Sequence, residues 1–145
     1  MNINLALARL FPSAKAGVDY ILRDDGNGQF IENWNLPDPI PTDEQMQIAA
    51  SEQEKYIVVA QYTAGVQKYL DDFARTRNYD GILSAATYAT SAVPKFKAEG
   101  QYAVEARDAT WAKCYEILAA VEGGTRPMPT LEELIAELPV LAWPN

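Results

Sequence analysis

Proline placement is the feature that most constrains the fold of this chain. Three prolines fall within five residues, at Pro37, Pro39 and Pro41, and the next proline is Pro94. Because proline fixes φ and pushes its predecessor toward extended backbone, "NLPDPIPTDEQ" is predicted to be a stiff, polyproline-like connector. The long proline-free segment that follows can form a helix, and a second helix can begin at Pro94.

The first long helix is predicted over residues 43–77. Thr42 is a suitable N-cap, and Gln45 three residues later completes a capping box. Gly65 interrupts the pattern and indicates a close crossing or a bend. One face steps by four and three residues. It consists of Val59, Thr63, Val66, Leu70 and Phe73.

The second long helix is predicted to run from Pro94 to Gly123 and Gly124, where glycine is typical of a helix end. Two apolar stripes adjoin on it. They are Val104, Trp111, Tyr115 and Leu118, and Ala103, Thr110, Cys114, Ile117 and Val121. Two adjoining stripes predict wide burial, with Trp111 packed against the helix of residues 43–77.

Shorter helices are predicted on either side of this one. "NYDGILSAATYA" restarts a helix, with Asp80 as its expected cap. "LEELIAEL" forms another, because Thr130 and Glu133 make a second capping box. The tail "VLAWPN" is apolar and is expected to pack on another surface, which the sequence does not identify.

The stretch "RDDGNGQFIENW", residues 23–34, resembles a calcium loop at first sight. With Gly28 at position 6 of such a loop, Arg23 takes the place of the first carboxylate and Trp34 that of the closing glutamate. The flanks alternate in polarity, as strands do, and Gly and Asn supply the positive φ of a reversal. We therefore predict a β-hairpin here and no metal site.

No residue set indicates catalysis. The chain has no histidine and a single cysteine, Cys114, which lies on an apolar helical face. There is no Gly-rich phosphate loop before a helix and no facing pair of carboxylates. The expectation is a protein that is not an enzyme, with no catalytic residues, no cofactor and no metal. A net charge of −8 argues against nucleic acid, and no apolar run approaches a membrane span.

The predicted fold class is mainly α (α+β). We expect an antiparallel helical bundle of two long and two or three short helices, with a small N-terminal β-hairpin. Two domains are predicted. Residues 1–41 hold a small helix, the hairpin and the Pro-rich connector, and residues 42–145 form the helical domain.

The hairpin is unusually apolar for its size, and a lone hairpin is marginal in water. One face can pack on the first helix, which leaves the other face and the open strand edges for another chain. The alternative is that the hairpin folds back on the helices as core. The residues predicted to bind protein are Tyr20, Leu22, Phe30, Ile31 and Trp34.

Two stretches resemble proteins of tailed bacteriophages. In residues 79–139, "YDGILSAATYA", "VPKF" and "GTRPMPTLEEL" occur in the order found in a helical domain of small phage proteins. Residues 11–46, a hairpin ending in Trp that leads through prolines to a Thr-capped helix, resemble the start of phage tail and fibre-assembly proteins. One departure is "AVEARDATW", where an aromatic near Glu105 is expected.

The resemblance implies a tail-associated role and no catalytic residues. The first hypothesis is an assembly factor, or chaperone, that binds the tail fibre in the host cytoplasm. The alternative is a permanent structural component of the virion tail or tail fibre. The expected partner is a tail-fibre or other tail protein, with a homo-oligomer left open. A small-ligand or host-effector role has no supporting residue set.

Overall fold

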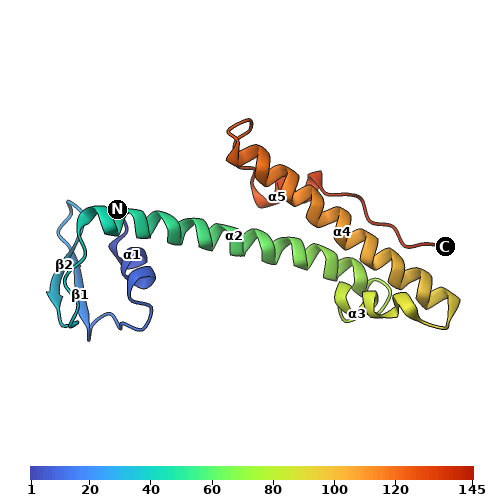
Figure 1. Ribbon diagram of the computed structural model, residues 1–145, viewed down its shortest axis with the longest axis horizontal. Helices are drawn as coiled ribbons and strands as arrows, with labels where there is room; N and C mark the ends of the chain where they lie inside the picture. Colours follow the sequence, from blue (N-terminus) through green and yellow to red (C-terminus); the bar gives the residue numbers. More distant parts are fainter. The chain divides into compact units, whose positions relative to one another are not determined.

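The computed structural model describes residues 1–145 and divides into two compact units, residues 1–61 and 62–145. The elements are those of a mainly helical chain with a small N-terminal hairpin (Figure 1), which confirms the predicted fold class. The predicted domain boundary after residue 41 concerns independent folding and stays a prediction. Each unit has its own core and is described by itself.

Unit 1 contains α1 (Ile3–Leu10), β1 (Tyr20–Asp24), β2 (Gln29–Trp34) and the first part of α2 (Asp43–Arg75). The two strands pair antiparallel, as predicted. The start of α2 is fixed by the predicted capping box, in which Thr42 and Gln45 exchange hydrogen bonds of 2.9 and 3.2 Å. The core of unit 1 consists of Ile3, Ala6, Leu7, Tyr20, Met46, Ala49 and Ala50.

Unit 2 contains the rest of α2, then α3 (Ile82–Ala86), the 3₁₀ helix η1 (Thr87–Thr90), α4 (Pro94–Glu122) and α5 (Leu131–Glu137). Its core is built from residues of α2, α3, α4, α5 and the segment after α5. They are Val66, Leu70, Ala74, Ile82, Ala85, Ala103, Ile117, Leu134 and Leu138. No helix is sufficiently long and apolar to span a bilayer.

The prediction that Asp80 caps the short helix α3 is wrong. Gly81, not Asp80, takes the N-cap position, and it has no side chain to offer. Oδ1 of Asp71, a residue of α2, accepts instead from the backbone N–H of Ile82 at 2.8 Å. A residue distant in sequence thus supplies the cap and joins α3 to α2.

Only one of the two predicted stripes of α4 faces the core. Tyr115 is 68% exposed and Val104 is also exposed, while Trp111 is half-buried rather than buried. The buried positions of α4 form a row of mostly small side chains, which allows backbones to approach closely. This row consists of Glu99, Ala103, Ala106, Thr110 and Ile117, with Gly100 beside it.

The apolar tail is packed, as predicted, and its contacts lie within unit 2. Trp143 stacks on Phe73 with ring centroids 4.4 Å apart, and its Nε1–H donates to Thr76 Oγ1 at 3.0 Å. The Ala142 N–H donates to the Tyr102 hydroxyl at 2.8 Å. The tail therefore covers the end of α2 and one side of α4.

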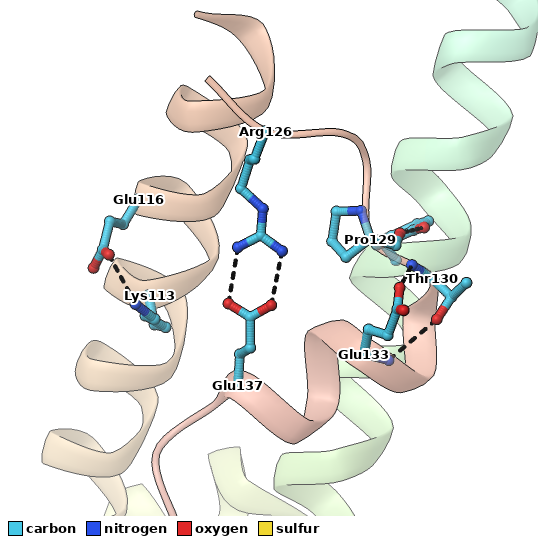
Figure 2. A network of polar contacts seen from close by, with 8 residues as sticks. Lys113, Glu116, Arg126, Pro129, Thr130, Glu133 and Glu137 are labelled. Atoms are coloured by element: carbon cyan, nitrogen blue, oxygen red, sulfur yellow. Dashed lines mark hydrogen bonds and ion pairs between the residues drawn. The ribbon is translucent and has the colours of Figure 1, made fainter. Parts of the chain in front are cut away.

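Polar contacts fix α5 and the loop before it (Figure 2). The predicted capping box is present, with Thr130 and Glu133 bonded in both directions. Arg126 holds Glu137 with two hydrogen bonds of 2.7 and 2.9 Å, and these bonds lower the pKa of the Glu137 carboxyl. The Tyr62 hydroxyl donates to the Pro129 carbonyl, which ties the loop to α2.

Candidate protein-binding surface

The hairpin carries a β-bulge that sets which side chains face the core. Leu22 pairs with Ile31, but the preceding residue Ile21 pairs with Asn33, so Glu32 is an extra residue in β2. An extra residue reverses the alternation of side chains beyond it. Simple alternation predicted Phe30 and Trp34 on one face, and the bulge instead brings Ile31 and Trp34 together.

Four of the five residues predicted to bind protein lie on the inner face. Tyr20 is buried, and Leu22, Ile31 and Trp34 pack around the unit 1 core. The Trp34 ring meets Phe11 edge to face at 5.3 Å, and its Nε1–H donates to the Asp38 carbonyl at 2.7 Å. The alternative that the hairpin folds back as core therefore describes this face.

Phe30 is the one member of the predicted set on the outer face, where it is 42% exposed. It pairs with Arg23, whose Nε lies 2.6 Å from the Glu32 carboxylate across the strands. Val18 and Ile40, near the hairpin in sequence, are also exposed. The outer face thus combines one aromatic ring with a surface ion pair.

The two strand edges of the hairpin differ. On β1, the Gly17 N–H donates to the Tyr20 carbonyl at 2.8 Å, within a bridge between Ala16 and Tyr20. On β2, no further backbone partner bonds to Gln29–Trp34. An unpaired edge offers backbone donors and acceptors to an incoming strand.

In the stretch that resembles a calcium loop, two carboxylates accept hydrogen bonds from the backbone of the hairpin turn. Asp24 Oδ1 accepts from the Gly26 N–H, and Asp25 Oδ1 from the Asn27 N–H, both at 2.9 Å. Gly26 and Gly28 have φ of 90° and 134°, the left-handed region that favours glycine. These contacts explain the Gly/Asn/Asp composition as turn chemistry, and the prediction of no calcium binding stays a prediction.

Sequence reasoning missed a second exposed apolar surface, on α2 within unit 1. Ile48, Tyr56 and Val59 are 55%, 63% and 49% exposed there. The stripe predicted through Val59, Thr63 and Phe73 holds only from Val66 onward. The run of five apolar residues "YIVVA" at 56–60 could have indicated this exposed surface, because consecutive apolar residues occupy more than one side of a helix.

Unit 2 holds one buried charged cluster, which the sequence did not indicate. Glu99 is 3% exposed, and its two oxygens accept from Arg77 Nη1 and the Tyr79 hydroxyl, each at 2.7 Å. A pocket of about 210 Å³ beside it is lined by the cluster, Asn78, Tyr88, Lys95 and Phe96. Because each group is bonded to another member, the cluster acts as a structural bridge between α4 and the segment after α2.

The free energy of unfolding is expected to fall at alkaline pH because of Tyr79. Its burial, and then the adjacent Glu99 carboxylate, raise the pKa of the hydroxyl from 10.0 to about 12. The stabilisation is present below the unfolded pKa and is lost as pH rises toward the folded one. We expect the parent to lose more unfolding free energy than Tyr79→Phe between about pH 9 and about pH 11, in urea melts. Equal losses would contradict this assignment.

A match to a known family lies in unit 1. Residues 3–57 match the family model described as XkdW protein. Over 50 residues the chain is 40% identical to the Phage-like element PBSX protein XkdW of Bacillus subtilis (strain 168), covering 34% of this chain. The match spans 46% of that relative, about half its length. No solved structure gives a significant match. The two matches support a phage protein.

Proposed function

We propose that this chain is a non-enzymatic accessory factor that binds a phage tail fibre while the fibre assembles in the host cytoplasm. Unit 1 makes the contact, through the outer face of the hairpin and the free edge of β2. The resemblance of residues 11–46 to the start of fibre-assembly proteins motivates the tail fibre as the partner.

The observation that carries this proposal is that the inner face of the hairpin packs against the unit 1 core. Tyr20 is buried, and Leu22 and Ile31 pack against the unit 1 core, so the inner sides of both strands are fixed by packing. Phe30 and the unpaired β2 edge are therefore presented on a backbone that is already ordered. Pre-ordering lowers the entropy lost when a partner strand adds to the edge.

The proposal can be tested by co-purification of the full chain with the tail-fibre protein of its own phage. Phe30→Glu should reduce the fibre recovered at least tenfold, because it replaces the one aromatic ring of the outer face with a charge. Tyr115→Glu is the matched control, since Tyr115 is an exposed aromatic of unit 2. Recovery at the parent level with Phe30→Glu would show that the fibre binds elsewhere.

Point variants are preferable to a truncation of residues 1–42. Met46, Ala49 and Ala50 of α2 belong to the unit 1 core. Residues 43–145 alone would therefore expose three apolar side chains to water, and a loss of binding could reflect aggregation.

The alternative is a permanent structural component of the virion tail or tail fibre. It predicts the same protein contact but a different persistence. Quantitative mass spectrometry of purified particles separates the two, since a structural component is found at a fixed ratio to the fibre. An assembly factor is expected to be absent or far below that ratio.

A further inference from the structure

The exposed side of α2 in unit 1 carries a pattern that is complementary to itself. Ile48, Glu52, Lys55 and Val59 step by four, three and four residues, as along one seam of a helix. Ile48 and Val59 are about half exposed, and Glu52 and Lys55 are exposed between them. The seam thus has an apolar residue at each end and opposite charges at its centre.

This seam lies away from the unit 1 core. The core positions Met46 and Ala50 precede Ile48 and Glu52 by two residues each. Two residues correspond to about 200° around a helix, and the third core position, Ala49, follows Ile48 by one residue, or about 100°. The seam therefore lies on another side of α2 than the core, with Ala49 at the margin between them. A partner can therefore cover the seam without displacing the apolar core of unit 1, and the contact it meets within unit 1 is the exposed Arg9–Glu52 ion pair.

We propose that the seam binds a second copy of this chain, with the two α2 segments antiparallel about a two-fold axis. With the axis midway between Gln53 and Glu54, Ile48 of each copy faces Val59 of the other. Glu52 of each copy then faces Lys55 of the other. A parallel pairing would instead oppose like charges at both central positions.

A shallow groove beside the seam gives this contact additional surface. It has a volume of about 290 Å³ and is lined by Arg9, Glu52, Lys55, Tyr56 and Val59. The Arg9–Glu52 ion pair in its wall is long, at 3.5 Å, and exposed, so it offers little resistance to a partner. The seam spans about 17 Å, so we expect a weak dimer with a Kd of about 10–100 µM.

Sedimentation equilibrium of the full chain tests the dimer. The parent should show a concentration-dependent dimer, and Val59→Glu should be monomeric at about 1 mM. Val59 is exposed, so this variant should keep the parent's circular dichroism spectrum. A parent that stays monomeric at about 1 mM would overturn the proposal, whatever else covers the seam.

Charge variants test the antiparallel alignment. Glu52→Lys and Lys55→Glu should each raise the dimer Kd about tenfold, because each opposes like charges at two symmetric positions. The double variant should restore the parent Kd, and an equimolar mixture of the single variants should form a heterodimer. Glu52→Lys removes the ion pair with Arg9, whereas Lys55→Glu leaves it in place. If both variants raise the dimer Kd equally, loss of the Arg9 pair is not the cause.

Glu54→Lys is the control for net charge. It changes the charge as Glu52→Lys does, but at an exposed position off the seam. Because the chain carries −8, added positive charge should by itself favour association slightly. If Glu52→Lys behaves as Glu54→Lys does, the antiparallel pairing is wrong. Fibre recovery is a separate readout, and the dimer variants are expected to leave it unchanged.

Discussion

Gly100→Ala is expected to destabilise unit 2 by about 3 kcal/mol, although alanine is the better helix former. A Cβ at position 100 would lie 2.2 Å from the backbone nitrogen of Ala89 and 2.3 Å from the carbonyl carbon of Tyr88. Backbone atoms of η1 cannot rotate away as a side chain can, so α4 and η1 would have to separate. The roughly 1 kcal/mol that alanine contributes to a helix interior does not offset this overpacking.

Gly65→Ala provides the matched control in the other long helix. The atoms nearest to a Cβ there belong to the Leu131 side chain, with Cδ1 at 2.6 Å. Leu131 is partly exposed and can change rotamer, so the contact costs little. We expect Gly65→Ala to remain within about 1 kcal/mol of the parent in urea melts followed by circular dichroism. Coincident melts of Gly100→Ala and the parent would refute the close approach of η1 to α4.

Features fixed by neighbouring residues were predicted correctly. The two capping boxes, at Thr42 and Thr130, need only a side chain three residues away. The start of α4 at Pro94 and the hairpin turn depend likewise on local φ preferences. Gly65 was also expected to mark a close crossing or a bend, because glycine itself is the signal, but its distant neighbour Leu131 was not predicted.

Features fixed by residues distant in sequence were not predicted. Asp71 caps α3 from another helix, and no local pattern distinguishes it from the adjacent Asp72. The bulge at Glu32 reverses the hairpin faces, because alternation cannot reveal one extra residue. Ile31 and Trp34, both assigned to the binding surface, therefore pack together against the unit 1 core and are half-buried.

The stripes of α4 were misjudged because apolar character was weighed without size. Tyr115 and Trp111 are larger than Ala103 and Thr110, yet the small residues are the fully buried ones. A close helix contact selects small side chains and leaves large ones at its margin. Because Trp111 is half-buried, Trp111→Ala is expected to cost less than the roughly 3–5 kcal/mol of a fully buried tryptophan.

Arg77→Met should cost about 3 kcal/mol, more than Glu99→Met at the other end of the same ion pair. The Glu99 side chain is 4% exposed, whereas that of Arg77 is 37% exposed. Without Arg77, a buried carboxylate keeps only the Tyr79 hydroxyl as a donor. Without Glu99, the partly exposed guanidinium can bond to water where it lies, 6.0 Å from the centroid of the Trp143 ring.

The double variant Arg77→Met/Glu99→Met separates this explanation from a loss of packing. If a stranded buried charge is the cause, removing Glu99 as well should recover part of the stability lost by Arg77→Met. If the Arg77 side chain matters through its apolar stem, the losses should instead add. Urea melts of the parent, both single variants and the double variant supply the full cycle. An additive cycle would contradict the stranded charge and would assign the cost of Arg77→Met to lost packing.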